Sequence, residues 1–130
     1  MLNLNLAQNL VNTALDIAQS RNQSIAVSIC DTHGELISFS KMDDVSVQAG
    51  LLAQNKAYTS ARDRQPSGNL GAWAKETGKD ISYWTDGRIT GFKGGIPIEK
   101  AEQIIGAIGI SGLSEQEDEE LAKEVIARCL

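Results

Sequence analysis

A four-residue turn separates two strand-like segments of the chain, and this short spacing constrains the fold more than any other feature of the sequence. Within residues 24–31, apolar side chains alternate with small ones, and after the turn Ile37 and Phe39 alternate with serines. The turn, residues 31–34, reads Asp-Thr-His-Gly, and Gly34 is free to adopt a positive φ. Strands joined by so short a connection pair antiparallel, so we expect a β-hairpin within an antiparallel sheet.

One face of the first strand carries only small side chains, which are Ala26, Ser28 and Cys30. Two glycines also interrupt a later strand-like run, residues 103–111. Glycines inside a strand mark either a bulge or a surface against which another element packs very closely. We therefore expect a helix to lie directly on the small-residue face of the sheet.

Three segments before the later strands have the period of an amphipathic helix. The first helix is expected over residues 4–21. The second begins near Asp44 and ends before Pro66, because proline disfavours helical backbone in the residue before it. A short third helix, over residues 70–76, interrupts the otherwise irregular segment 67–87.

A final helix begins at Ser114, which has Glu117 three residues later and so forms the sequence pattern of a capping box. Its first turns are strongly acidic. These acidic side chains are expected to be solvated and to favour the positive end of the helix dipole; they are Glu115, Glu117, Asp118, Glu119 and Glu120.

The elements thus follow the order helix, hairpin, helix, short helix, two or three further strands and a last helix, or α-β-β-α-α-β-β-β-α. This order predicts an α+β fold with a central antiparallel sheet. No repeat or linker interrupts the chain, so a single domain is expected over residues 1–130.

The composition argues against several classes of function. A formal net charge of -5 is unfavourable for binding nucleic acid, which needs a surplus of basic residues on one face. The N-terminus has no basic segment followed by an apolar run, and no stretch approaches the roughly 18 apolar residues of a membrane span. We therefore expect a cytoplasmic protein that neither enters a membrane nor is secreted.

Two cysteines, Cys30 and Cys129, lie far apart in the sequence and are expected to be reduced and buried. Together with a single histidine they cannot supply the ligands of a structural zinc site, so we expect no metal site. That histidine, His33, lies in the hairpin turn beside Asp31, where an exposed turn residue is expected and a ligand or acid–base role is the alternative. No serine or cysteine is placed to complete a catalytic triad, so we assign no catalytic residue.

Lys56 is the most informative candidate for a binding site. It occupies a helical stripe that otherwise consists of alanine, leucine and serine residues. One interpretation is a lysine that extends along the edge of the helix–sheet contact with its ammonium group in water. The other is a cation that lines a small pocket and binds an anionic ligand.

Two further features could contribute to a ligand site. The run Gly94-Gly95-Ile96-Pro97-Ile98 predicts a tight turn that could present backbone N–H groups, although it lacks the context of a dinucleotide-binding loop. Most of the aromatic residues gather in the irregular segment and could form a pocket wall, an oligomer interface or part of the core. They are Trp73, Tyr83, Trp84 and Phe92.

Four segments together resemble the GlcG/HbpS-like family, which includes the C-terminal domain of PduO-type proteins. They are residues 26–34 followed by Lys41-Met42-Asp43; Lys56-Ala57-Tyr58-Thr59-Ser60-Ala61; Gly94-Gly95-Ile96-Pro97-Ile98; and residues 106–112 with Glu117-Asp118-Glu119 after them. These motifs span nearly the whole chain. The resemblance implies a profilin-like sheet of about five antiparallel strands flanked by helices, and assembly into a homo-oligomer.

Some members of this family bind haem or related tetrapyrroles, in some cases through a histidine on the first helix, whereas residues 4–21 contain no histidine. If haem is the cofactor, the remaining candidates for a ligand of its iron are Thr59, Tyr58, Met42 and His33. Alternatively, a porphyrin edge inserts at a subunit interface and no side chain binds the iron.

Three functional hypotheses follow from these features. The first is a non-enzymatic accessory protein, linked to diol or glycerol utilisation or to cobalamin metabolism, that binds a small molecule or a tetrapyrrole. Its binding residues would be Lys56, Tyr58, Thr59, Gly94, Gly95, Asp31 and Trp84. The second is an enzyme that uses Lys56 on a carbonyl metabolite. The third is a purely structural, oligomer-forming protein.

Overall fold

The computed structural model describes all residues, 1–130, and its elements follow the expected order. They are α1 (Leu4–Ser20), β1 (Ala26–Cys30), β2 (Leu36–Lys41), α2 (Val47–Asp63), α3 (Gly68–Thr77), the 3-10 helix η1 (Ile81–Trp84), β3 (Gly95–Lys100), β4 (Gln103–Ser111) and α4 (Glu115–Cys129). The α+β class, the hairpin and the helices expected from the sequence are confirmed, as is the capping box between Ser114 and Glu117.

The sheet has four strands in the order β2-β1-β4-β3, and all neighbouring strands are antiparallel. The expected number of about five strands is therefore wrong by one. Residues 85–94 form no strand, because backbone N–H groups of this segment donate to side chains rather than to a neighbouring strand. The N–H of Thr90 donates to Thr59 Oγ1 and that of Lys93 to Glu115 Oε1, both at 3.0 Å.

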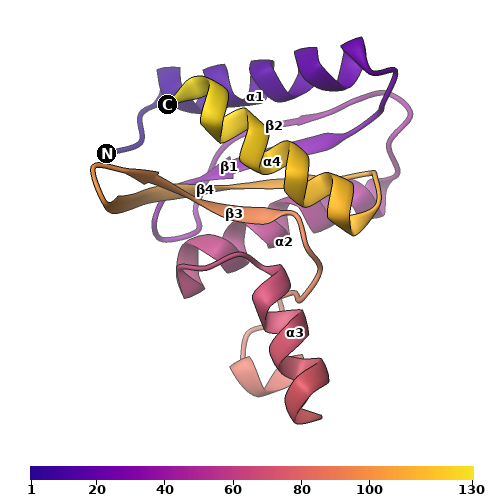
Figure 1. Cartoon of the computed structure of the whole chain (residues 1–130), viewed down its shortest axis with the longest axis vertical. Helices are drawn as coiled ribbons and strands as arrows, with labels where there is room; N and C mark the ends of the chain where they lie inside the picture. Colours follow the sequence, from indigo (N-terminus) through magenta and orange to yellow (C-terminus); the bar gives the residue numbers. More distant parts are fainter.

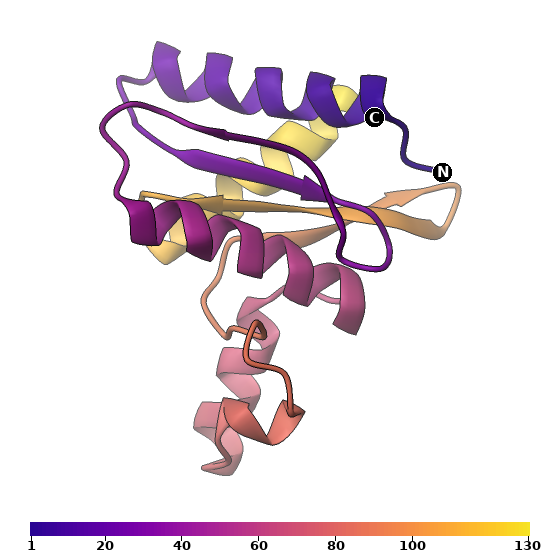
Figure 2. The same ribbon diagram turned by 180° about the vertical axis from the view of Figure 1, so that it is seen from behind.

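Helices cover both faces of the sheet (Figure 1). α1 and α4 lie on one face and α2 lies on the other, which comes to the front when the molecule is turned (Figure 2). The face beneath α1 and α4 carries the large apolar side chains of the strands, and these form the main core with the buried residues of the two helices. The core residues from the strands are Val27, Ile29, Ile96, Ile98, Ile105, Ile108 and Ile110, and Ile25 just before β1 joins them.

The opposite face carries small residues on β1, β3 and β4, and α2 packs on it at backbone distance. A Cβ atom added at Gly95 would lie 2.2 Å from the carbonyl oxygen of Lys56, and one at Gly109 would lie 2.1 Å from that of Ala53. These two glycines are paired across β3 and β4. The expectation of a helix directly on the small-residue face is confirmed, and any larger side chain at these positions would push α2 off the sheet.

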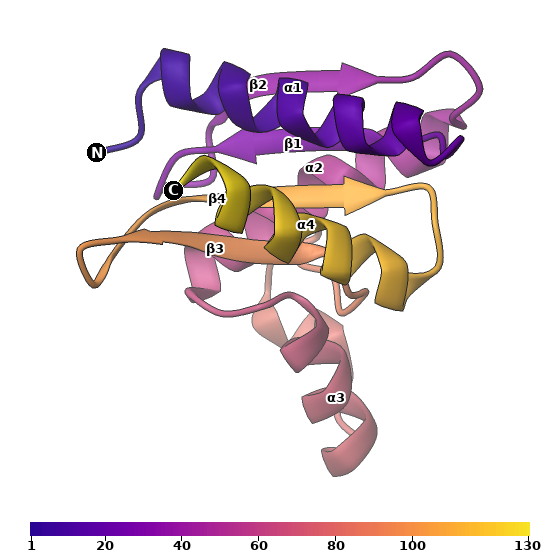
Figure 3. The same cartoon turned by 45° about the horizontal axis from the view of Figure 1, so that its top comes forward.

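α3 and η1 extend away from the sheet, below the three layers in Figure 1, and the turned view in Figure 3 shows the same separation. α2 ends at Asp63 and is capped by Arg64, whose backbone is left-handed (φ 58°, ψ 35°), and the chain then passes Pro66 to enter α3. The 3-10 helix η1 lies where only an irregular loop was expected. None of the helices combines the length and hydropathy that a membrane span requires.

Candidate functional site

The side chain of Lys56 lies in the interior, where only 1% of it is exposed. Its Nζ atom donates to the carbonyl oxygen of Ile110 at 2.8 Å and to Asp118 Oδ2 at 3.0 Å. None of the four cavities of the molecule is lined by Lys56. The ammonium group therefore does not extend into water, as one interpretation had it, and in this structure Lys56 lines none of the cavities.

Asp118 is also buried, with 2% of its side chain exposed, whereas the sequence predicted a solvated acid in the first turn of α4. Its Oδ1 atom accepts a hydrogen bond from the N–H of Leu113 at 3.0 Å. Burial raises the pKa of Asp118 and lowers the pKa of Lys56, and in each case the opposite charge of the partner counteracts the shift. The pair is a buried ionic link between α2 and α4, which cover opposite faces of the sheet.

Gly94 and Gly95 allow this link to form. A Cβ atom added at Gly94 would lie 2.8 Å from Lys56 Nζ and 2.5 Å from the carbonyl oxygen of Ile110, and its φ of 131° suits glycine. The backbone N–H of Gly95 donates to Ser67 Oγ at 2.9 Å. In this structure these glycines provide space for the helix and for the lysine, and neither of them lines a cavity.

Tyr58 and Thr59 do lie beside each other on α2, but they take part in different interactions. Thr59 is fully buried and accepts the hydrogen bond from Thr90. The hydroxyl of Tyr58 donates to Asp86 Oδ2 at 2.5 Å, which raises the pKa of Tyr58 and lowers that of Asp86. Guanidinium groups flank the Tyr58 ring, with Arg88 at 4.0 Å and Arg62 at 5.0 Å from its centroid.

The remaining predicted site residues do not converge on one site. Asp31 Oδ1 accepts from the backbone N–H groups of His33 and Glu35, so it stabilises the hairpin turn, and His33 is exposed there. Met42 packs against the main core, and its sulfur accepts from the N–H of Ile25 at 3.3 Å. Trp84 packs edge-on against Trp73 at 5.6 Å and lines a small cavity beside Asp86.

The largest cavity is an open cleft of about 630 Å³ between α3 and the segment that leads into β3. We call it the α3 cleft, and its lining residues are Gly68, Gly71, Ala72, Lys75, Ile81, Ile89, Thr90, Gly91, Phe92, Lys93 and Glu115. Its two walls touch through glycines, because a Cβ atom added at Gly71 would lie 2.3 Å from the carbonyl oxygen of Gly91. The cleft therefore offers flat backbone surfaces, apolar side chains and two ammonium groups.

Comparison with known proteins decides the family. The family model described as "Haem degrading protein HbpS-like" matches residues 2–127. The chain belongs to the HbpS-like family. It is 31% identical over 111 residues to protein GlcG of Escherichia coli K12, an alignment that covers 85% of this chain and 81% of GlcG.

Two further relatives of this HbpS-like chain are informative. The corrinoid adenosyltransferase PduO of Salmonella typhimurium is 28% identical over 120 residues, which cover 91% of this chain but only 36% of PduO. The solved structure "PduOC:Heme Complex" superposes with a TM-score of 0.90 at 26% identity and covers 99% of this chain and 94% of that one. These matches confirm the resemblance seen in the sequence.

The HbpS-like fold raises the question of haem, and the predicted axial ligands do not fit that role here. Thr59 is fully buried, and the Met42 sulfur and the Tyr58 hydroxyl are already hydrogen-bonded within the fold. His33 is accessible but lies in the hairpin turn and does not line the α3 cleft. The cleft residues fit the apolar edge and the carboxylates of a tetrapyrrole, and they include no histidine, methionine, cysteine or tyrosine to bind its iron.

Sequence reasoning identified the aromatic and glycine-rich segment but not the partner wall on α3. Phe92 and the neighbouring glycines were noticed, whereas Ala72 and Lys75 were not. Both are ordinary residues on the exposed face of a short helix, and only the tertiary contact between Gly71 and Gly91 shows that they face a cleft.

Proposed function

We propose that this protein is a non-enzymatic accessory protein that binds one edge of a flat, carboxylate-bearing tetrapyrrole of the haem class in the α3 cleft. One observation carries the proposal: the cleft combines glycine walls with apolar side chains and two lysines. A planar macrocycle can lie against bare backbone and apolar surface, and its carboxylates can pair with ammonium groups.

Each part of the cleft would make a different contribution. Ile81, Ile89 and Phe92 supply apolar contact, and Phe92 is 51% exposed before a ligand covers it. Lys75 makes no hydrogen bond or ion pair within the chain, and Lys93 Nζ has only the exposed amide oxygen of Gln116, at 3.1 Å. Both ammonium groups are therefore available to an anionic ligand.

Glu115 is the one acidic group that lines the α3 cleft. Its position limits its repulsion of a ligand carboxylate. Its Oε1 atom accepts from the backbone N–H of Lys93, so the carboxylate is held at the N-terminus of α4. The haem-bound structure of the PduO C-terminal domain supports tetrapyrrole binding by this fold, and the match to PduO supports a setting in diol utilisation or cobalamin metabolism.

Two further parts of the proposal concern the state of the protein. Exposed aromatic side chains, Tyr83 at 65% and Phe92 at 51%, support self-association into a homo-oligomer through the protruding segment. Two free thiols, Cys30 and Cys129, support a reducing cytoplasmic location.

Titration with haemin, followed through its Soret absorbance, tests the binding function. We expect a saturable spectral change. Ala72→Trp should weaken the haemin affinity by about tenfold or more, because the indole fills the cleft. Glu76→Trp is the matched control, since Glu76 is exposed on α3 and does not line the cleft. Equal affinities of these two variants would refute the assignment to the cleft, and the absence of any saturable change would refute tetrapyrrole binding.

Lys75→Gln tests the carboxylate contact, with Lys79→Gln as its control beyond the end of α3. We expect only Lys75→Gln to weaken haemin binding. Cyanocobalamin serves as the comparison ligand, because its peripheral groups are amides. If cyanocobalamin bound more tightly than haemin and Lys75→Gln left its affinity unchanged, the ligand would belong to a different class.

A further inference from the structure

A second cavity, of about 380 Å³, lies at the end of α2 and shares no lining residue with the α3 cleft. We call it the Arg64 cavity, and it is lined by Thr32, Ala61, Arg64, Glu102, Gln103 and Ile104. Three separate parts of the chain form it: the β1–β2 turn, the last turn of α2 with its C-cap, and the start of β4. None of these residues belongs to the tetrapyrrole site proposed above.

Arg64 differs from the other four arginines, because its guanidinium group has no partner within the chain. Arg21 and Arg128 both pair with Glu124, Arg62 donates to the carbonyl oxygen of His33, and Arg88 donates to Asn55. The side chain of Arg64 makes no hydrogen bond, ion pair or cation–π contact within the chain. Arg64 is exposed, so water solvates its five N–H donors until an anion replaces it.

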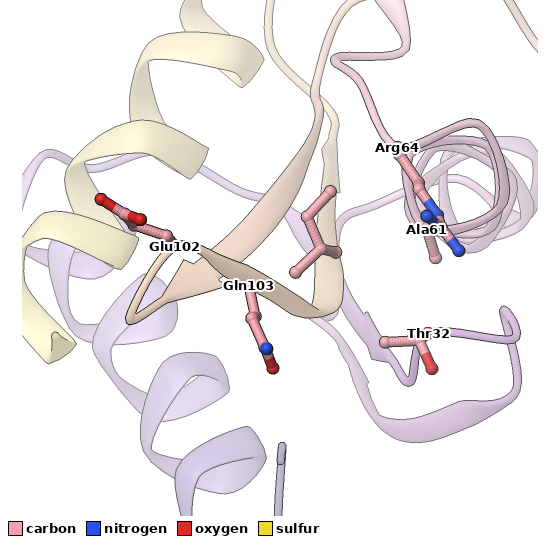
Figure 4. Close-up of a pocket in the computed structure, with 6 residues that line it drawn as sticks. Thr32, Ala61, Arg64, Glu102 and Gln103 are labelled. Carbon is pink, nitrogen blue, oxygen red and sulfur yellow. The ribbon is translucent and has the colours of Figure 1, made fainter.

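The polar groups around Arg64 are also unpaired. Neither the hydroxyl of Thr32 nor the side-chain amide of Gln103 takes part in a hydrogen bond within the chain. Figure 4 shows these two side chains and that of Arg64 around a common space, with Ala61 beside the arginine. Ile104 and Ala61 give this space an apolar wall.

Glu102 does not neutralise the arginine. No ion pair joins the two residues, and in Figure 4 the Glu102 carboxylate points away from the other labelled side chains. Its orientation follows from the two-residue β3–β4 turn, in which Ala101 and Glu102 both have positive φ, 52° and 64°. Arg64 also has a positive φ, 58°. Three non-glycine residues with left-handed backbone thus lie at or next to the cavity.

We propose that the Arg64 cavity binds a small monocarboxylate that carries a hydroxyl or carbonyl group next to its carboxylate. The planar guanidinium matches a carboxylate in a two-point contact. Thr32 and Gln103 bind the neighbouring oxygen, and Ala61 and Ile104 contact a short carbon chain. The cavity has one cation, Arg64, and the Glu102 carboxylate is near it. It therefore favours a monoanion over phosphate or a dicarboxylate, because a second negative charge would have no cation to pair with.

Nuclear magnetic resonance titration of the ¹⁵N-labelled protein with sodium lactate, at constant ionic strength, tests this site. We expect saturable shifts of the Arg64 side-chain Nε–H and of the backbone amides of Thr32 and Gln103. Arg64→Asn should weaken binding at least about tenfold, because it removes a charge-assisted contact. Asparagine tolerates the left-handed backbone at this position, so the fold should persist.

Lys100→Gln is the matched control, because it removes an exposed positive charge from the same hairpin without touching the cavity. It should bind lactate as the unaltered protein does, and so should Ala72→Trp in the α3 cleft. Lactamide, which has no charge, should produce no saturable shift. The proposal is overturned if lactate fails to saturate, if Arg64→Asn or lactamide behaves like the reference, or if inorganic phosphate binds more tightly than lactate.

Discussion

Lys56 and Asp118 lie on helices that cover opposite faces of the sheet, and their side chains meet at 3.0 Å beside Gly94, just before β3 begins. The lysine also donates to Ile110 on β4, and the aspartate accepts from Leu113 at the start of the connection to α4. The pair therefore joins α2, the sheet and α4 at one point. We therefore expect the pair to stabilise the packing of the two helices on the sheet.

Lys56→Met should lower the free energy of unfolding by about 3–5 kcal/mol, because the substitution leaves an uncompensated buried carboxylate. Urea denaturation measures this change. The double variant Lys56→Met/Asp118→Asn should recover much of the loss, since it removes the charge and keeps an acceptor for Leu113. If the double variant were no more stable than Lys56→Met, the lysine would stabilise the fold through packing alone.

The stability deficit of Lys56→Met should also depend on pH. Burial raises the pKa of Asp118 above its ordinary value of 3.8, so the folded state binds a proton before the unfolded state does. Such a group contributes stability at low pH and loses it as pH rises through the folded-state pKa. Lys56 lowers the pKa of Asp118 in the unaltered protein, so Lys56→Met should raise this pKa further and gain more stability on acidification. The deficit relative to the unaltered protein should therefore shrink on acidification, and a deficit that grew would contradict a buried Asp118 charge.

Gly109→Ala should destabilise the protein by about 3 kcal/mol, the upper end of the range for overpacked cores. The added methyl group would lie 2.1 Å from the carbonyl oxygen of Ala53 and 2.6 Å from the backbone nitrogen of Ala57, and backbone atoms cannot move aside as a flexible side chain can. Gly87→Ala is the control, because nothing lies within 4 Å of its added methyl group. Thermal unfolding should place Gly87→Ala within about 0.5 kcal/mol of the reference.

Cys30 should resist thiol reagents in the folded protein, because 2% of it is exposed and burial raises the pKa of its thiol to about 12. Labelling with Ellman's reagent should modify only Cys129 before denaturation and both thiols after it. Between the ordinary pKa of 9.0 and about 12, the unfolded thiol ionises first, so rising pH should lower the unfolding free energy. Cys30→Ala should lack this part of the pH dependence, and rapid labelling of Cys30 would contradict its burial.

The hydrogen bond between Tyr58 and Asp86 should be visible in an alkaline absorbance titration of the two tyrosines, Tyr58 and Tyr83. The carboxylate raises the pKa of Tyr58, so the absorbance change of this phenol should occur above its ordinary pH range. Asp86→Asn should lower the pKa of Tyr58, and Asp80→Asn, which alters a cap of η1, should not. Identical titrations in all three proteins would rule out this contact in solution.

The sequence predicted most of the fold because the relevant signals are local. The apolar period of α1 and the alternation in β1 are visible within short windows, and the capping pattern at Ser114 marks the start of α4 correctly. The small residues of β1 also indicated the close approach of α2. The number of about five strands came from the family resemblance, and the sheet of this chain has four strands.

The site was harder to predict because its determinants are tertiary. Lys56 was singled out correctly as unusual, but its partner lies 62 residues away in a run of acids that looks fully solvated. Only the packing of α4 turns Asp118, alone among these acids, into the interior. Likewise, nothing in the sequence around Gly71 indicates that it meets Gly91, 20 residues away, in a wall of the α3 cleft.

The most direct test of tetrapyrrole binding in the α3 cleft is to locate the ligand on the protein. Zinc protoporphyrin IX is diamagnetic and carries the same carboxylates as haem, so its titration can be followed by amide chemical shifts. The account predicts saturable shifts concentrated in α3 and residues 89–93, with little change in α1 or around His33. Shifts centred on α1 or on the hairpin turn, with α3 unaffected, would contradict it.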